Sequence, residues 1–250
     1  MGRSRARAEL ARYVALTFGF TWALWIPVAA LEPARPIAMT LILMGAFGPS
    51  LMGAWLTGRF GGPGARRDMW RRVVDGRRIP GRWWLVLLLL FPLMAGAAVL
   101  INRAAGGTDP SPDVATLTNP AALLVFLIMM LLGGPLAEEL GWRGFAQDRV
   151  GALLSPVPAS LLLAAIWILW HAPLFFIPTT SQGALGFGSV GFWIWSGQVV
   201  AYTFLYTWIW HHTGRSILAA IMLHLMTNST FTILAGLGGS LPRSLDLAML

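Results

Sequence analysis

Long apolar runs alternate with short polar segments along the whole chain. Most runs have roughly 18 residues or more, about the length a helix needs to cross the hydrocarbon core of a bilayer. The pattern predicts an all-α, polytopic membrane helical bundle of about seven transmembrane helices, forming a single membrane domain over residues 1–250. The expected spans are residues 13–30, 37–56, 83–100, 120–149, 155–177, 192–210 and 217–237.

The composition agrees with a membrane protein and excludes several kinds of chemistry. Hydrophobic residues make up 56% of the chain and charged residues only 11%, far from the composition of a soluble domain. The absence of cysteine excludes disulfides, thiolate metal sites and cysteine nucleophiles. Because all 18 basic residues are arginine, a serine–lysine dyad is excluded as well.

The net charge of +8 is interpreted as a topology signal rather than as a nucleic-acid-binding surface. The arginines cluster beside apolar segments, as expected for residues held on the cytoplasmic side of a cell membrane. This bias predicts a cytoplasmic amino terminus. The arginine-rich segment 59–82 fits two structures equally well: a basic amphipathic helix on the inner leaflet, or a plain cytoplasmic loop.

A charged stretch, residues 136–145, directly follows an apolar run. A charged side chain at bilayer depth costs about 3 kcal/mol, so such groups usually face a protein interior and are paired. Glu139 and Arg143 stand four residues apart, which places them on one helical face as an ion pair. Glu138 is turned about 100° away from that face and has no such partner, so it can exchange a proton. The preceding segment, 133–135 (Gly-Gly-Pro), is expected to kink the helix.

Two later apolar spans also carry polar side chains. His171 lies within the span 155–177, and His224 and Asn228 share a face of another because they are four residues apart. Counted from the presumed cytoplasmic helix ends, all these groups lie roughly 10 to 24 Å deep, so they can meet. Each one alone fits an interhelical hydrogen bond equally well. Together they predict a functional site.

Carboxylate, imidazole and amide groups in an enclosed cavity suit hydrolysis. A glutamate or histidine can take a proton from water, and hydrogen-bond donors can stabilise the oxyanion of a tetrahedral intermediate. The same groups can instead hold a divalent metal that activates the water. The H-E-x-x-H and G-x-S-x-G motifs are absent, which argues against an ordinary zincin and a serine nucleophile. The sequence is therefore compatible with hydrolysis by a metal-bound water and with hydrolysis by a metal-free water.

Three separated motifs resemble those of the CPBP family of intramembrane proteases. These are E-E-x-x-x-R, an aromatic residue four positions before a histidine, and H-x-x-x-N, and the resemblance covers residues 121–235. The family includes CAAX prenyl endopeptidases and bacterial relatives linked to bacteriocin immunity. Its second motif usually has phenylalanine where this chain has tryptophan, which changes the expected pocket wall. The matching residues are Glu138, Glu139, Arg143, Trp167, His171, His224 and Asn228.

The resemblance implies an endopeptidase that acts on a protein or peptide substrate at the bilayer, lipidated in the CAAX branch. Glu138 with His171 would activate water, while His224 and Asn228 would hold the oxyanion. The ion pair of the first motif would support Glu138. A divalent metal such as zinc, bound by Glu138, His171 and His224, is one form of the mechanism, and a metal-free glutamate mechanism is the other.

Two other functions fit the same residues. A non-catalytic bacteriocin-immunity or chaperone-like membrane protein would keep the architecture without turnover. A proton-coupled transporter would use Glu138 and the histidines as a proton relay. Replacing Glu138 by glutamine distinguishes these cases, because only a hydrolase should lose turnover while it keeps its fold.

Overall fold

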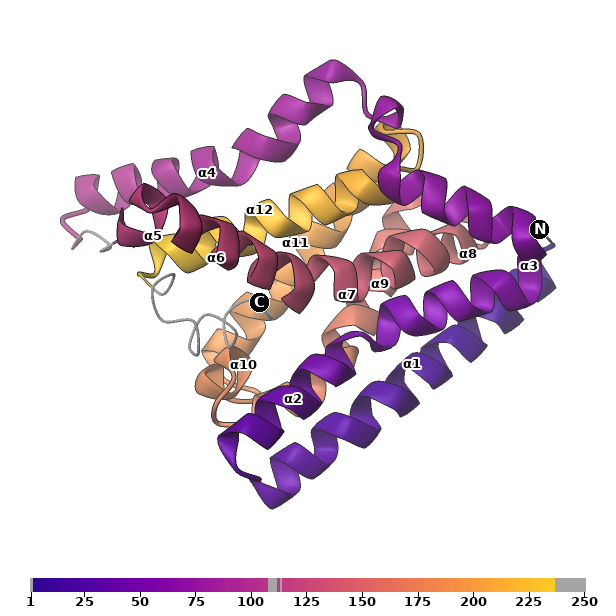
Figure 1. The fold of residues 1–250 in the computed structure, drawn as a ribbon, viewed down its shortest axis with the longest axis horizontal. Helices are drawn as coiled ribbons and strands as arrows, with labels where there is room; N and C mark the ends of the chain where they lie inside the picture. Colours follow the sequence, from indigo (N-terminus) through magenta and orange to yellow (C-terminus); the bar gives the residue numbers. More distant parts are fainter. Residues whose placement is uncertain (1, 108–111, 113, 237–250) are drawn as a thin grey trace.

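The computed structural model describes residues 2–107, 112 and 114–236, and this part of the chain is built from helices with no strand (Figure 1). The expected all-α fold is therefore confirmed. The elements are α1 (Arg3–Leu31), α2 (Arg35–Ala46), α3 (Gly48–Val74), η1 (Gly76–Arg78), α4 (Gly81–Ala104), α5 (Val114–Thr118), α6 (Pro120–Gly133), α7 (Pro135–Gly141), η2 (Trp142–Ala146), α8 (Gln147–Gly151), α9 (Pro156–Trp170), η3 (Ala172–Phe176), α10 (Ser181–Leu185), α11 (Val190–His212) and α12 (Ile217–Leu234).

Within the described residues, six helical stretches are long and apolar enough to cross a membrane, so this is a multi-pass membrane protein. The sixth expected span, 192–210, corresponds to α11, which has 23 residues but is not one of the six. Its length is sufficient, since 20 residues suffice for about 30 Å. Its apolar residues are interrupted by polar and aromatic side chains such as Gln198 and Tyr202, which lower its mean hydropathy.

The helix boundaries within the second expected span and the arginine-rich segment differ from those predicted. Phe47 separates α2 from α3, so residues 37–56 form two helices rather than one. Helix α3 then continues to Val74 through a kink at Gly62, whose φ of +68° lies in the left-handed region. Two thirds of the arginine-rich segment 59–82 is thus the end of a long kinked helix, followed by η1 and the first turn of α4.

The charged stretch belongs to a broken helix, as the Gly-Gly-Pro sequence predicted. Gly134 adopts φ −143° and ψ −71°, which ends α6, and Pro135 begins α7. Proline suits a first helical position because its missing N–H would have no intrahelical partner there. After only seven residues, α7 passes into the π-helical turn η2. Single π turns inside helices are frequent at functional sites.

Helix α7 lies centrally in the bundle, where it packs against α3, α6 and α12 (Figure 1). The contact with α3 is made through glycines. A Cβ atom on Gly53 would lie 2.7 Å from the Cα of Gly141, and one on Gly141 would overlap the carbonyl oxygen of Pro49. Because the two backbones touch, α7 is held in a fixed position. The carboxylates that it carries are fixed with it.

Candidate active site

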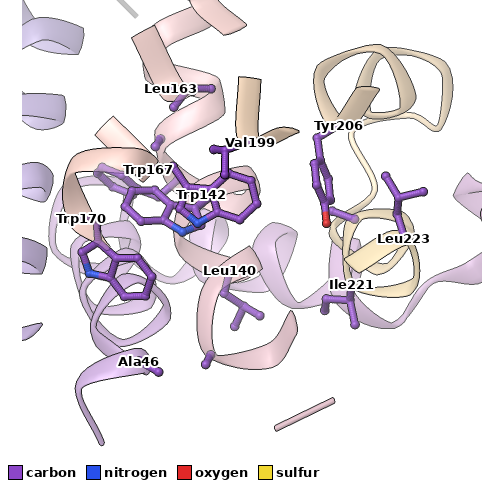
Figure 2. Close-up of a cluster of buried hydrophobic side chains, with 14 of the residues drawn as sticks. Ala46, Leu140, Trp142, Leu163, Trp167, Trp170, Val199, Tyr206, Ile221 and Leu223 are labelled. Atoms are coloured by element: carbon purple, nitrogen blue, oxygen red, sulfur yellow. The ribbon is translucent and has the colours of Figure 1, made fainter. Parts of the chain in front are cut away.

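Glu138 is a buried carboxylate held by two tryptophans. Its side chain is on α7, the residue is 3% exposed, and Oε2 accepts hydrogen bonds from two indole nitrogens. Trp142 Nε1, one turn further along the chain, donates over 3.0 Å, and Trp167 Nε1 on α9 donates over 2.7 Å. These two rings and Trp170 gather on one side of the buried cluster in Figure 2. Both donors are neutral, so neither cancels a charge on Glu138.

Glu139 takes the charged partners instead. The predicted ion pair is present, with Arg143 Nη1 3.1 Å from Oε2 and 3.2 Å from Oε1 of Glu139. Oε1 also lies 2.8 Å from His224 Nδ1 on α12, a contact that the sequence did not predict. The Arg143 guanidinium stacks on aromatic rings, with its central carbon 3.9 Å from the ring centre of Tyr206 and 4.9 Å from that of Trp167. Burial, the ion pair with Glu139 and stacking on the two rings together fix the position of the Arg143 guanidinium.

His171 is anchored by a backbone carbonyl rather than by a carboxylate. Its Nδ1 lies 2.8 Å from the carbonyl oxygen of Trp167. A carbonyl oxygen only accepts hydrogen bonds, so Nδ1 carries the hydrogen, and in the neutral ring Nε2 is then an acceptor. The imidazole packs against three indoles, with ring centres 4.6 Å away for Trp170, 5.2 Å for Trp195 and 5.9 Å for Trp167.

Residues from all three motifs meet around Trp167. Its indole N–H donates to Glu138. The centre of its ring lies 5.9 Å from the ring centre of His171 and 6.0 Å from the ring centre of His224. Trp167 was expected to form a pocket wall, and it is also a hydrogen-bond donor to the first motif. Asn228 is buried one turn beyond His224 and lines a cavity of ≈ 250 Å³ between α11 and α12.

The same contacts limit how a metal could be held. Catalytic zinc sites usually have three protein ligands. Within the described ranges, no three histidine, aspartate or glutamate side chains come together closely enough to hold a metal ion. Glu138 Oε2 already accepts two N–H groups, and Glu139 Oε1 is bound to His224 Nδ1. The set proposed from the resemblance, Glu138, His171 and His224, thus does not fit a metal site with three protein ligands.

Two comparisons with known proteins match this architecture. Residues 120–230, which contain all the motifs, match the family described as Type II CAAX prenyl endopeptidase Rce1-like. A curated protein of Methanococcus maripaludis, CAAX prenyl protease 2, is 27% identical over 231 residues, covering 89% of this chain and 84% of the relative. The family match and the relative agree with the resemblance carried by the three motifs. Both comparisons therefore confirm that the chain resembles the CAAX-type membrane proteases of the CPBP family.

Proposed function

We propose that this protein cleaves a peptide bond in a membrane-associated substrate by attack of a water molecule that Glu138 and His171 activate. The proposal rests mainly on one observation. Of two adjacent buried carboxylates, Glu139 binds the cationic partner Arg143 and the His224 imidazole, whereas Glu138 binds only neutral indoles. A buried carboxylate without an opposite charge in contact is suited to accept a proton.

The first step is proton transfer from water. The indoles of Trp142 and Trp167 hold Oε2 of Glu138, which leaves Oε1 to accept the proton. His171 supports the same water through Nε2, because its Nδ1–H is engaged by the Trp167 carbonyl. As the proton passes to Glu138, the water oxygen forms a bond to the carbonyl carbon of the substrate. The π electrons of that carbonyl move to its oxygen.

His224 and Asn228 are the proposed donors to the resulting oxyanion. Glu139 binds His224 Nδ1, which fixes the orientation of the ring and leaves Nε2 as the nitrogen that would face the oxyanion. Oxyanion donors of this type commonly contribute about 3 to 4 kcal/mol to transition-state stabilisation. When the intermediate collapses, the C–N bond breaks and Glu138 returns its proton to the leaving nitrogen.

The proposed substrate is a lipidated peptide. The matched family and the archaeal relative are both described by CAAX prenyl processing. The site also lies within helices that are apolar enough to cross the bilayer, so a substrate anchored by a lipid would already be at the correct depth. The arginine bias supports access from the cytoplasmic side, with a cytoplasmic amino terminus.

Peptide cleavage by the purified protein tests this function. We expect a prenylated CAAX-type peptide to be cleaved, the same peptide without the prenyl group to be cleaved more slowly, and a chelator to leave both rates unchanged. Elemental analysis of the same sample should show no stoichiometric metal. Loss of activity on chelation with recovery on zinc addition would contradict the metal-free mechanism. Absence of any cleavage, or proton-linked solute uptake into liposomes, would contradict the protease assignment.

A further inference from the structure

The cavity between α11 and α12 contains a buried hydrogen-bond donor without an acceptor. Trp195 lines the cavity and is 3% exposed, and its Nε1 has no hydrogen-bond partner among the described residues. The ring of this tryptophan also packs on His171, with ring centres 5.2 Å apart. Buried N–H groups are nearly always paired, so an unpaired one beside reactive groups calls for an acceptor that arrives with a ligand.

The cavity continues directly from the proposed oxyanion donors. Its residues on α12 include Asn228 and Phe231, which recur at helical spacing on the face that carries His224. The volume of ≈ 250 Å³ is somewhat below the range of about 300 to 1,000 Å³ typical of pockets for whole small-molecule ligands. The lining carries no charged side chain: Trp195, Gln198, Val199, Tyr202, Thr227, Asn228, Phe231, Thr232 and Ala235.

We propose that this cavity binds a short uncharged segment of the substrate next to the scissile bond, with Trp195 Nε1 donating to a peptide carbonyl. This inference rests on the proposed function. A backbone carbonyl is an acceptor that every peptide presents, and an uncharged lining disfavours a charged side chain because burial would remove its hydration. Trp195 is therefore a substrate-binding residue, separate from the groups that activate water.

Trp195→Phe tests this role, because it keeps an aromatic ring on His171 and removes the indole N–H, together with ring volume that the control variant loses as well. One lost neutral hydrogen bond should raise KM about five- to tenfold and leave kcat within about twofold. Trp210→Phe is the matched control. Trp210 is 8% exposed on the same helix, its Nε1 is likewise unpaired among the described residues, and it does not line the cavity. Its substitution should leave both constants unchanged.

A second variant tests the cavity without removing a buried group. Gln198 is an exposed lining residue, and Gln198→Trp should obstruct the cavity and raise KM with an unchanged thermal midpoint. If the wild type cleaves peptide but neither Trp195→Phe nor Gln198→Trp raises KM, the subsite is wrong and the proposed function stands. An equal rise in KM in the Trp195→Phe and Trp210→Phe variants would also overturn the proposed subsite. If the wild type cleaves no peptide, both proposals are wrong.

A second cavity lies at the kink in α3. It has a volume of ≈ 360 Å³ and is lined by two arginines, Arg59 and Arg66, and by two tryptophans, Trp55 and Trp70. The Arg66 side chain folds back toward Gly58, so Arg59 and Arg66 line the same cavity. No ion pair joins either arginine to a carboxylate in the described ranges. Two like charges in one cavity repel each other, and an anion bound between them would offset this repulsion by attracting both.

We infer that this second cavity binds the phosphate of an anionic phospholipid headgroup. Trp55 is 57% exposed and Trp70 is 50% exposed, as expected for tryptophans at a membrane interface, where the ring lies at headgroup level. Arginine matches phosphate geometry through paired N–H donors. A free phosphate offers the same oxygens without acyl chains, and the tryptophans favour the lipid.

Lipid binding by native mass spectrometry tests this site with phosphatidylglycerol, phosphatidylcholine and inorganic phosphate as probes. The double variant Arg59→Gln/Arg66→Gln should bind phosphatidylglycerol about tenfold to thirtyfold more weakly than the wild type. Its matched control is Arg67→Gln/Arg71→Gln, which removes the same charge from exposed positions of α3 outside the cavity lining and should retain most binding. Equal weakening in both double variants, equal binding of phosphatidylcholine, or equally tight binding of free phosphate would overturn the proposal.

Discussion

Two ionic clusters differ in how their charges are used. In the first, the Asp148 cluster (Arg72, Asp148 and Arg215), Asp148 Oδ2 accepts from Arg72 Nη1 over 3.0 Å and from Arg215 Nη2 over 2.6 Å. Arg72 donates further to two backbone carbonyls, those of Arg215 and Arg143. In the second, the Glu139 cluster (Glu139, Arg143 and His224), the carboxylate binds a guanidinium and an imidazole, with Glu138 beside it.

The difference indicates which cluster is structural and which is reactive. Every charged side chain of the Asp148 cluster contacts an opposite charge, and its bonds tie α3 to α8, η2 and the connection between α11 and α12. Beside the Glu139 cluster, Glu138 has only neutral donors. Because Arg72 also binds the carbonyl of Arg143, the first cluster supports the second. Stability should therefore depend on both clusters, and turnover mainly on the second.

The largest expected effect on folding is that of Glu139→Gln. It leaves the Arg143 guanidinium, 2% exposed, without its carboxylate, and an unpaired buried charge costs about 3 to 5 kcal/mol in the free energy of unfolding. A glutamine oxygen can keep the bond to His224 only by turning the amide N–H groups toward Arg143, so the imidazole is held less firmly and the folded variant should cleave more slowly. Denaturant unfolding in detergent micelles measures the first effect. The double variant Glu139→Gln/Arg143→Met should recover stability but not activity, and wild-type stability of the single variant would contradict this account.

Arg72→Gln should have the next largest effect, on stability alone. Asp148 keeps Arg215 as a partner, so the loss is that of charge-assisted hydrogen bonds, about 2 kcal/mol. The kcat of the folded protein should stay within about threefold of the wild type. Arg71→Gln, which changes an exposed neighbour on the same helix, is the control and should alter neither quantity. If kcat falls while the unfolding free energy is unchanged, the separation between the two clusters is wrong.

The smallest effect is expected for Trp167→Phe, which restores the residue usual in the family. Glu138 keeps the Trp142 donor and loses the Trp167 donor, so kcat should fall about five- to tenfold. Trp170→Phe removes another buried indole donor, one that binds Thr21 rather than Glu138, and should leave kcat unchanged. Equal losses in the two variants would show that the indole bond to Glu138 has no special role.

The sequence predicted those features that depend on spacing within one helix. These include the spanning lengths, the Glu139–Arg143 pair and the break at Gly134. The bond from Trp142 to Glu138 follows the same four-residue spacing, so it could have been predicted but was missed.

Features that depend on which helix faces become neighbours could not be predicted. The Glu139–His224 contact joins residues 85 positions apart, and the Arg72–Asp148 pair joins residues 76 positions apart. Helical periodicity gives a side chain's direction around its own axis and says nothing about its partner in another helix. The division at Phe47 was missed because the apolar run continues through it without a break.

The most direct test of the central claim is the cleavage rate and thermal midpoint of Glu138→Gln, measured on the same preparation with the prenylated peptide. The glutamine oxygen can still accept the indole hydrogen bonds of Trp142 and Trp167, so the fold should be kept. It cannot take a proton from water, so cleavage should fall about a thousandfold, within the range for loss of a general base. An unchanged thermal midpoint with that loss is the predicted result, and cleavage at the wild-type rate would contradict the account.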